Sequence, residues 1–161
     1  MTTNALRFIG RYRFLSNFWL CEISVPFAIA HRPQRVITFP SVEHAYQALK
    51  SADPADWEFI RLQKTPGHAK RAGRSLTLRP GFEEQKLAIM QRLLHQKFSH
   101  GSSLGIQLAQ IDGVIQEGNT WHDTFWGIDL MTGEGSNHLG RLLMTIRDEL
   151  RRLRDLSNTF L

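Results

Sequence analysis

The residue pattern changes from strand-like to helical at Ser41-Val42-Glu43-His44-Ala45-Tyr46-Gln47-Ala48-Leu49-Lys50. The hydroxyl of Ser41 can accept a hydrogen bond from the first turn of a helix, as N-cap residues do. We expect the helix to run from Val42 to about Ala52, because Asp53-Pro54 follows and the residue before a proline disfavours helical geometry. The rest of the fold is predicted outward from this helix.

Three polar side chains of this helix fall on one narrow stripe. With about 3.6 residues per turn, Glu43, Gln47 and Lys50 point the same way, with Tyr46 beside them and apolar residues opposite. Two interpretations stay open. Either the polar stripe of an amphipathic helix faces water, or a carboxylate and an amine point into one pocket, with Gln47 between them as a hydrogen-bonding spacer.

Strand-like sequence precedes the helix. The segments 6–13, 20–29 and 36–39 alternate weakly or are rich in branched and aromatic residues, which predicts short strands. Between the first two segments lies Phe14-Leu15-Ser16-Asn17-Phe18-Trp19, whose Ser-Asn centre predicts a turn. The first 40 residues are therefore expected to form strands and loops.

Helical periodicity dominates the sequence that follows. We predict a strand over 114–116 and helices over 55–63, 67–72, 82–98, 103–110 and 137–156. Early strands followed by clustered helices predict an α+β fold rather than a doubly wound sheet. The chain has no repeat, low-complexity tract or linker, so residues 1–161 are expected to form a single compact domain.

Composition is that of one ordinary domain. Hydrophobic residues make up 42% of the 161 residues and charged residues 22%, which is typical of a globular chain rather than a disordered one. No apolar run approaches the roughly 20 residues that a membrane span needs, and residues 1–13 lack the layout of a signal peptide. A lone cysteine, Cys21, cannot form an internal disulfide. These features predict a cytoplasmic protein that does not enter a membrane.

The positive charge is distributed unevenly. A net charge of +5 favours partners that carry phosphate, including nucleotides and nucleic acid. The block from Lys64 to Arg79 contains five lysine or arginine residues and no acid, and it either contacts a phosphate or is simply exposed. A second cluster, Arg147 to Arg154, is interrupted by Asp148 and Glu149 and is interpreted as a solvated helix face.

The segment from Glu117 to Gly127 places two tryptophans, an acid and a histidine in a predicted loop. Aromatic side chains are costly to expose, so Trp126 either plugs the edge of a core or stacks on a flat ligand. We interpret His122 as a structural or surface histidine. Asp123 either forms a turn or has a specific partner, because a carboxylate between aromatic residues needs one.

The sequence gives little support for metal or nucleotide-loop chemistry. The seven histidines show no pair at metal-ligand spacing, and a single cysteine cannot supply a thiolate pair. No stretch matches a Walker loop, a Gly-x-Gly-x-x-Gly turn or a Gly-x-Ser-x-Gly elbow. We therefore expect no metal ion and no cofactor, and we interpret Cys21 as a small core residue.

Taken together, several motifs resemble the NADAR family, whose members include the YbiA-like proteins. The resemblance runs from about Phe14 to Leu150, and its specificity lies in the order and spacing of the motifs. They are Leu15-Ser16-Asn17-Phe18, the Ser-x-Glu-His-x-x-Gln-Ala-x-Lys pattern of Ser41 to Lys50, Thr65-Pro66, Ala69-Lys70-Arg71-Ala72-Gly73-Arg74, Leu78-Arg79, Lys86, Met90, Lys97-Phe98, Glu117, Asp123, Trp126-Gly127, Asn137-His138-Leu139-Gly140 and Leu143-Met144. The chain departs from the family at Phe82, where tryptophan is common. An aromatic wall survives that change, but a ring N–H hydrogen bond does not.

The resemblance implies hydrolysis of an N-glycosidic bond. Family members of the riboflavin pathway split ribosylaminopyrimidine phosphates into a base and ribose 5-phosphate, and other members remove ADP-ribose from guanine in nucleic acid. In both substrates ribose C1 is bonded to an exocyclic amine, and such an aminal can open to an imine. A ring-nitrogen nucleoside does not open as easily.

Two mechanisms are open for the catalytic residues that the resemblance implies, Glu43, Lys50 and Asp123. In the first, Lys50 has a lowered pKa, attacks the C1 imine and forms a Schiff base, while Glu43 shuttles protons. In the second, the carboxylates stabilise an oxocarbenium-like transition state, and Asp123 or Glu43 activates water.

The substrate-binding residues that the resemblance implies come from the whole chain. Contacts with ribose or phosphate are assigned to Ser16, Asn17, Gln47, Arg71 and Arg74. Stacking on the base is assigned to Phe82 and Trp126. Asn137 is either the N-cap of the last helix or an anion contact at its dipole.

Three functional classes stay open. They are a metabolic N-glycosidase acting on riboflavin-pathway intermediates, which we prefer, an ADP-ribosyl hydrolase of nucleic acid, and a non-catalytic module that binds ADP-ribose or NAD. The basic charge favours the second class slightly. The presence of Glu43, Lys50 and Asp123 argues against the third, because a binding module has no need of an acid and an amine together.

Overall fold

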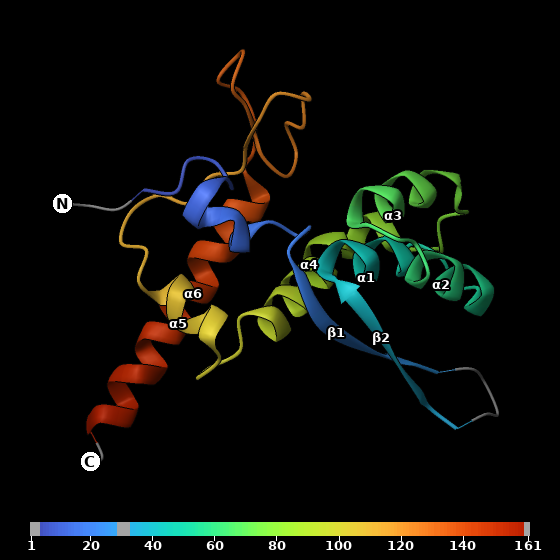
Figure 1. Cartoon of the computed structure of the whole chain (residues 1–161), viewed down its shortest axis with the longest axis horizontal. Helices are drawn as coiled ribbons and strands as arrows, with labels where there is room; N and C mark the ends of the chain where they lie inside the picture. Colours follow the sequence, from blue (N-terminus) through green and yellow to red (C-terminus); the bar gives the residue numbers. More distant parts are fainter. Residues whose placement is uncertain (1–3, 29–32, 160–161) are drawn as a thin grey trace. The chain divides into compact units, whose positions relative to one another are not determined.

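The computed structural model describes residues 4–28 and 33–159 (Figure 1). By their contacts the residues group into two compact units, Asn17–Lys97 and the combination of Met1–Ser16 with Phe98–Leu161. Helices and short strands occur in both, so the mixed helix-and-sheet class predicted from the sequence is confirmed. The single domain predicted over residues 1–161 stays a prediction. Within the described ranges, no helix combines the length and the apolar character needed to cross a membrane.

The unit Asn17–Lys97 begins with an antiparallel hairpin of β1 (Leu20–Phe27) and β2 (Arg35–Ser41). Alternate side chains of β1 are buried, namely Ile23, Val25 and Phe27. This period of two is expected where only one face of a sheet is covered. Both strands lie where they were predicted, although the predicted end of the first, Ile29, falls outside the described residues.

The remainder of this unit is helical. Its elements are α1 (Val42–Ala48), α2 (Pro54–Arg61), α3 (Pro66–Ala72), the 3-10 turn η2 (Gly73–Ser75) and α4 (Phe82–Lys97). Asp53 and Thr65 cap α2 and α3, and each helix has a proline in its first turn, where a missing N–H costs little. The cap and proline signals therefore account for the close agreement with the predicted starts.

The helix α1 is the core of this unit. The Ser41 hydroxyl accepts a hydrogen bond from the His44 N–H at 3.2 Å, so Ser41 is the N-cap, as predicted. All seven residues of α1 are buried, and α2, α3, α4 and both strands contact the helix. The interpretation of its polar stripe as a water-facing surface is therefore wrong.

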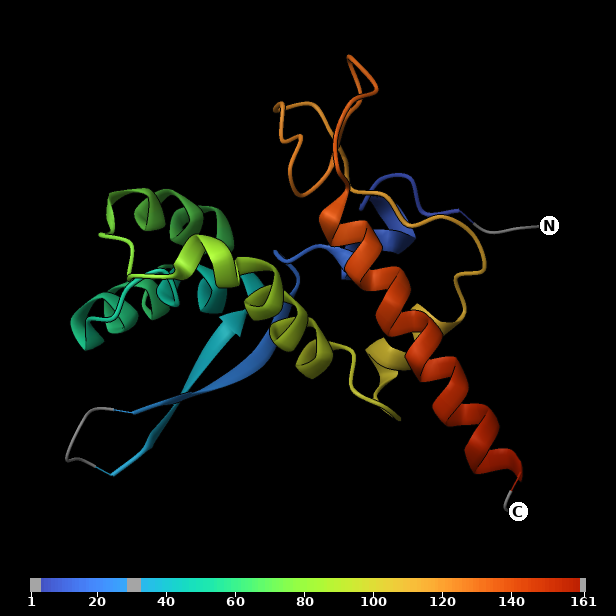
Figure 2. The same ribbon diagram turned by 180° about the vertical axis from the view of Figure 1, so that it is seen from behind.

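The helix α4 is fastened to the outer edge of β1. The Gln96 side chain accepts a hydrogen bond from the Ser24 N–H at 2.9 Å and donates one to the Ser24 carbonyl at 2.6 Å. This amide takes the place of a third strand at that point of the edge, where backbone groups would otherwise need water or another chain. Figure 2 shows α4 running past β1 in this unit.

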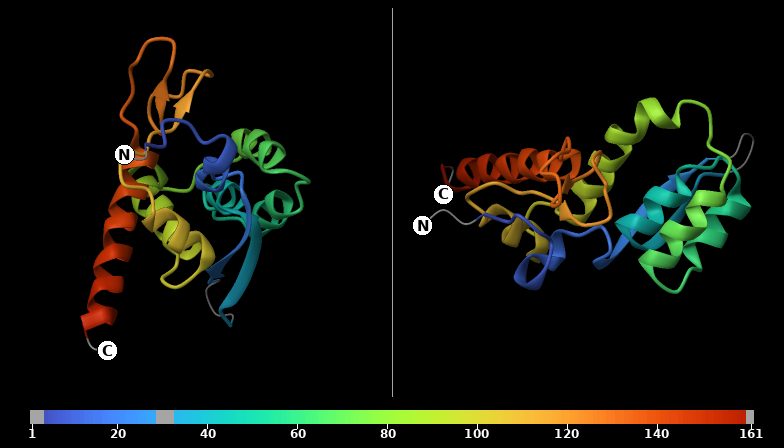
Figure 3. Two further views of the ribbon diagram at one scale, coloured as in Figure 1. Left: turned by 60° about the vertical axis from the view of Figure 1, so that its left-hand side comes forward. Right: turned by 90° about the horizontal axis from the view of Figure 1, so that it is seen from above.

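The other unit is organised along the long helix α6 (His138–Thr159). Its other elements are the 3-10 helix η1 (Gly10–Leu15), α5 (Ser103–Ala109), β3 (Gly118–Asn119) and β4 (Ile128–Asp129). The strands β3 and β4 pair in parallel (Figure 3), and Ala5 forms an isolated bridge with Ile115. The predicted strand over 114–116 is thus reduced to one bridged residue.

The predicted strand over residues 6–13 is wrong. The chain turns into η1 at Gly10, whose φ of +54° lies in the left-handed region that favours glycine. The Tyr12 N–H then bonds to the Ile9 carbonyl at 3.0 Å, which closes a turn in place of a strand ladder. The weak alternation of side chains had predicted a strand and did not indicate this local turn.

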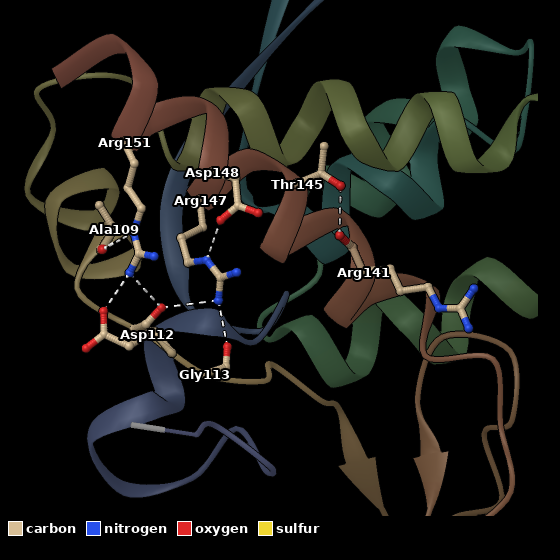
Figure 4. A network of polar contacts seen from close by, with 9 residues as sticks. Ala109, Asp112, Gly113, Arg141, Thr145, Arg147, Asp148 and Arg151 are labelled. Atoms are coloured by element: carbon tan, nitrogen blue, oxygen red, sulfur yellow. Dashed lines mark hydrogen bonds and ion pairs between the residues drawn. The ribbon is translucent and has the colours of Figure 1, made fainter. Parts of the chain in front are cut away.

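The basic cluster of α6 is also corrected, because it is not simply a solvated face (Figure 4). Arg147 is 8% exposed, and its guanidinium donates to the carbonyls of Ile111 at 3.2 Å and Gly113 at 2.6 Å. Arg151 donates to the Ala109 and Ile111 carbonyls at 2.9 and 3.0 Å. The two arginines therefore bind backbone carbonyls at the end of α5 and in the segment after it.

Candidate functional site

Lys50 lies two residues beyond the end of α1, in a turn rather than on the helix. Its N–H bonds to the Gln47 carbonyl at 3.2 Å. Arg79 fixes the same turn from outside, because its backbone N–H donates to the Lys50 carbonyl at 2.7 Å and its Nε donates to the Leu49 carbonyl at 2.9 Å. Carbonyls at a helix C-terminus lack partners within the helix, so Arg79 both closes α1 and sets the position from which the Lys50 side chain starts.

Glu43 and Gln47 form a buried pair on α1. They are 6% and 4% exposed, and the Gln47 Nε2 donates to the Glu43 Oε1 at 2.7 Å. Since the hydrogen bond fixes which end of the amide faces the carboxylate, the Gln47 Oε1 must point away from it. The hydrogen bond joins Gln47 to Glu43, and the role of Gln47 as a spacer between Glu43 and Lys50 stays a prediction.

Asn17 meets the same helix from the segment before β1. Its carbonyl accepts the Glu43 N–H at 3.1 Å, and its Nδ2 contacts the Met90 Sδ at 3.5 Å. Among the described residues, neither the Asn17 Oδ1 nor the Gln47 Oε1 has a hydrogen-bond partner, although both are buried. Buried acceptors without a partner are costly, so each of these two amide oxygens would be stabilised by a hydrogen-bond donor that reached it.

The end of α3 packs directly on Gln47. A Cβ placed on Gly73 would lie 1.9 Å from the Gln47 Oε1 and 2.7 Å from its Cδ. Any side chain at Gly73 would thus displace the amide that binds Glu43. This close approach gives a structural reason for glycine at the end of the basic motif.

The surroundings of Lys50 lower the pKa of its amine. Burial is the main cause; the charges of Lys70 and Arg74 act in the same direction, and those of Glu43 and Glu83 oppose them. The Lys50 Nζ lies 5.8 Å from the centre of the Tyr46 ring. A lysine with this environment has a larger neutral fraction near neutral pH than an ordinary lysine, which is what a nucleophilic amine needs.

Two of the residues just named, Lys70 and Glu83, were missed in the sequence analysis as site residues. Lys70 and Arg74 are four residues apart, across α3 and η2, and both act on Lys50. The spacing of four pairs Lys70 with Arg74, but no local pattern indicates that either would lie close to Lys50. Arg71, which was predicted with Arg74 to grip a phosphate, is exposed.

Phe18 was also missed. Its ring is 42% exposed and lies 5.9 Å from the Lys70 Nζ. By contrast Phe82, which was predicted to stack on a base, is 2% exposed and packs against the Tyr46 ring with centroids 5.6 Å apart. Phe82 supports Tyr46 from within the unit, and its contact with a substrate stays a prediction. The signal for Phe18 was its place at the end of the Leu-Ser-Asn-Phe motif.

The remaining predicted residues, Ser16, Asp123, Trp126 and Asn137, belong to the other unit. The Asp123 Oδ1 accepts the N–H groups of Phe125 at 3.1 Å and Trp126 at 2.8 Å, so the turn-forming interpretation holds in this structure. Trp126 is half-buried and its ring meets that of Phe125 edge-on at 4.9 Å. Catalytic or binding roles for these residues stay predictions.

Asn137 is not the side-chain cap that was one of its two interpretations. Its Oδ1 accepts the Glu117 N–H at 3.1 Å and its Nδ2 donates to the Ile115 carbonyl at 3.0 Å. The first N–H groups of α6 bond instead to backbone carbonyls of the preceding loop, those of Phe125 and Trp126. Asn137 has a φ of +50°, a conformation that asparagine tolerates better than most residues.

His122 is a structural histidine, as interpreted from the sequence. Its Nδ1 bonds to the Asp129 Oδ2 at 2.6 Å, and this hydrogen bond lowers the pKa of the Asp129 carboxyl. Within the described residues, no three histidine, cysteine or acidic side chains gather as a metal site would require.

Comparison with known proteins identifies the family of this chain. A model of the NADAR domain matches residues 7–151. The chain belongs to the NADAR family. The family predicted from the motifs is therefore confirmed, and the match includes both units of this NADAR protein.

Relatives of this NADAR protein carry two kinds of name. It is 37% identical over 125 residues to N-glycosidase YbiA of Shigella flexneri serotype 5b (strain 8401), across 75% of this chain and 78% of that protein. It is also 37% identical over 125 residues to the chloroplastic riboflavin biosynthesis protein PYRR of Zea mays, across 70% of this chain and 20% of that longer protein. The NMR structure of the E. coli protein YbiA matches with a TM-score of 0.76 and 31% identity, over 96% of this chain and 89% of that one.

Proposed function

We propose that this protein is an N-glycosidase that hydrolyses the bond between ribose C1 and an exocyclic amine. The preferred substrates are ribosylaminopyrimidine phosphates of the riboflavin pathway, from which it would release ribose 5-phosphate. The observation that carries the proposal is a half-buried Lys50 of lowered pKa whose charge neighbours include Glu43. The names of the relatives, N-glycosidase and riboflavin biosynthesis protein, support the same reaction. With Cys21 unpaired, we expect the reaction to take place in the cytoplasm.

The first half of the reaction transfers the ribosyl group to Lys50. The substrate aminal opens to a C1 imine, and the neutral Lys50 amine adds to C1. The exocyclic nitrogen takes one proton from Glu43 and one from the attacking Lys50 amine and leaves as the free amine of the base. The C1–N bond breaks, and a protonated Schiff base to Lys50 remains. A lowered Lys50 pKa favours this step, because only the neutral amine has a lone pair.

The second half hydrolyses the Schiff base. Glu43, now a carboxylate, takes a proton from water as the oxygen attacks C1, and the Lys50 nitrogen then leaves as the amine. The product is the aldehyde form of ribose 5-phosphate, which closes to the sugar ring. Gln47 donates a hydrogen bond to the Glu43 Oε1 and would hold the carboxylate in place during both steps.

Neighbouring groups would bind the rest of the substrate. Lys70 and Arg74 place positive charge close to Lys50, where a sugar phosphate would balance it. The unpartnered Asn17 Oδ1 would accept a hydrogen bond from a ribose hydroxyl or from the leaving amine. The exposed ring of Phe18 offers a stacking surface for the base.

An alternative mechanism uses the carboxylates alone, with Glu43 or Asp123 activating water against an oxocarbenium-like transition state. Ser16, Asp123, Trp126 and Asn137 enter the proposal as predicted contributions of the other unit. The Schiff-base route is preferred because it gives the lowered pKa of Lys50 a function. In the carboxylate route, Lys50→Ala would keep most of the activity, whereas the Schiff-base route requires its loss.

A second function is favoured by the charge of the chain. The net charge of +5 and the exposed Arg71 suit a nucleic-acid substrate, as an ADP-ribosyl hydrolase acting on guanine would need. A module that only binds ADP-ribose or NAD would not need Glu43 and Lys50 together.

One side-by-side assay separates these functions. The purified protein is given a ribosylaminopyrimidine phosphate and, separately, DNA carrying ADP-ribose on guanine, with Lys50→Ala as the matched control for each. Release of ribose 5-phosphate from the first substrate is expected, and its loss in Lys50→Ala. Activity on the DNA alone would reverse our order of substrates. No turnover of either, together with tight binding of ADP-ribose, would overturn the enzymatic proposal.

A further inference from the structure

A hollow lies in the unit Asn17–Lys97, beside the turn that carries Lys50. Its volume is about 530 Å³, and it is bordered by the edge of β1, the segment after α1, the start of α2 and one side of α4. Pockets that bind small molecules have volumes of roughly 300 to 1,000 Å³. Glu43, Lys50 and Arg74 do not line it among the described residues, so it is separate from the proposed catalytic site.

The charged groups of this hollow are of one sign. Of the described residues that line it, Arg79 and Arg92 carry positive charge and none carries negative charge. Asp56 is not among the lining residues described, and its Oδ2 accepts a hydrogen bond from the Ser51 hydroxyl at 2.5 Å. A hollow with two guanidinium groups and no lining carboxylate favours an anion.

The two arginines differ in how many hydrogen bonds their guanidinium groups already donate within the protein. The Arg79 Nε donates to the Leu49 carbonyl, and its Nη2 donates to the Gln85 Oε1 at 3.0 Å. These bonds hold the guanidinium in place, and its other N–H groups can still donate to a ligand. Arg92 is exposed and forms no hydrogen bond or ion pair within the part of the chain that the structure describes. The fixed guanidinium of Arg79 and the exposed one of Arg92 can both donate hydrogen bonds to a ligand that carries an oxyanion.

The walls of the hollow also contain apolar side chains. Trp57 and Phe27 meet with ring centroids 4.3 Å apart, and Leu93 and Ile89 continue the apolar lining along α4. The Gln96 amide on this wall is bonded at both ends to Ser24. A ligand therefore gains hydrogen bonds from the arginines and apolar contact elsewhere.

We propose that this hollow is a binding site for a small organic oxyanion, in which Arg79 and Arg92 hold the anionic group and the lining between β1 and α4 covers a compact apolar body. The site is distinct from the one at which ribose would be cleaved, and its assignment does not depend on the proposed N-glycosidase activity. Phosphate and carboxylate share the chemistry that the arginines recognise, and probes of each type distinguish them.

The test uses phenyl phosphate and benzoate as probes, with inorganic phosphate as the anion without a body. Binding to the whole protein is measured by calorimetry and by amide NMR shifts. At least one aromatic probe should bind more tightly than inorganic phosphate and shift the signals of Ser24 and Leu93. Arg92→Ala should weaken that binding by about tenfold or more, as expected for loss of a charge-assisted hydrogen bond.

Two control variants test whether the probe binds in the hollow rather than elsewhere on the protein. Arg61→Ala removes an exposed arginine of the same unit that does not line the hollow, and it should leave the affinity unchanged. Arg74→Ala alters the proposed catalytic site and should also leave it unchanged. Binding that survives Arg92→Ala but is lost in Arg74→Ala would place the probe at the catalytic site and overturn the proposal. Failure of all three probes to bind would overturn it as well.

Discussion

Lys50 can attack a sugar carbon only when its amine is neutral, so its charged neighbours should set the pH at which the enzyme works. Because the Lys50 pKa is lowered, kcat/KM should rise with pH, and the midpoint of this rise should lie at a lower pH than an ordinary lysine would give. Glu83→Gln removes a negative neighbour and should move this rise to lower pH. Arg74→Ala removes a positive neighbour and should move it to higher pH.

The position of the pH profile, rather than its height, is the readout for these two variants. Glu84→Gln is the control, since Glu84 is exposed beside Glu83 in the first turn of α4 and is not among the charges acting on Lys50. It should not move the profile. Shifts of Glu83→Gln and Arg74→Ala in the same direction would contradict the role given to Lys50.

Gly73 provides a steric test of the pair Glu43–Gln47. A methyl group there would overlap the Gln47 amide, so Gly73→Ala should cost about 1–3 kcal/mol of unfolding free energy, as overpacking does, and should reduce kcat strongly. Gly67→Ala is the matched control in the same helix, because the nearest atoms to its new Cβ lie at 3.8 Å. That variant should be neutral or more stable by about 0.5–1 kcal/mol, measured by urea unfolding.

At the scale of residues, helical spacing was enough to place Glu43 and Gln47 side by side. The expected helix end at about Ala52 was wrong, because α1 ends at Ala48 and Lys50 lies in a turn held by Arg79. Lys70 and Glu83 could not be found in the same way. They belong to α3 and α4, and packing of those helices on α1, rather than any local spacing, brings their charges close to Lys50.

At the scale of elements, one glutamine should account for a measurable part of the docking of α4 on β1. Gln96→Met removes two hydrogen bonds to Ser24 while keeping the length of the side chain. Since Ser24 is exposed and water can replace these bonds, the expected loss is about 1 kcal/mol in urea unfolding. Gln107→Met on α5, which loses one bond of 3.3 Å to the Ser103 carbonyl, should change stability by less than about 0.5 kcal/mol. Equal effects of both variants would count against the docking role.

Elements with a strong local signal were predicted well, and elements that depend on distant partners were not. The caps and prolines of α2 and α3 lie in the sequence beside the helices that they start. The segment around Gly10 had only a weak alternation, and a left-handed glycine turned it into η1. Arg147 was read as solvated because its acceptors, the carbonyls of Ile111 and Gly113, lie more than thirty residues away in the chain.

At the scale of the whole molecule, a buried lysine should make stability depend on pH. Lys97 is 4% exposed, and burial lowers its pKa to about 7 against a weaker opposing effect of Cys21. Between that value and the ordinary lysine pKa the unfolded chain binds more protons than the folded one, so stability rises with pH. The free energy of unfolding should increase by about 2 kcal/mol from pH 7 to pH 9 through this group.

The matched variant for this effect is Lys97→Met, which keeps an unbranched side chain and removes the charge. Its unfolding free energy should be higher than that of the parent protein at pH 7, and the difference should shrink towards pH 9. Parallel pH dependence of the two proteins would show that Lys97 is not titrated by folding.

The family and the reaction type were accessible from motifs spread over most of the chain, and the match to the NADAR domain over residues 7–151 confirms the family. The hollow bordered by Arg79 and Arg92 was not accessible in this way. Its lining comes from β1, from the segment after α1 and from one side of α4, and only the folded unit brings these together. Local patterns therefore indicated the family, whereas the lining of this hollow depends on the folded unit.

The most direct test of the central claim is to trap the covalent intermediate. The protein is mixed with a ribosylaminopyrimidine phosphate and sodium borohydride, and the intact and digested protein is weighed by mass spectrometry. Our account predicts a reduced ribose 5-phosphate adduct on the peptide that contains Lys50, and no adduct in Lys50→Ala. Full turnover of the substrate by the parent protein with no adduct, or full activity of Lys50→Ala, would contradict it.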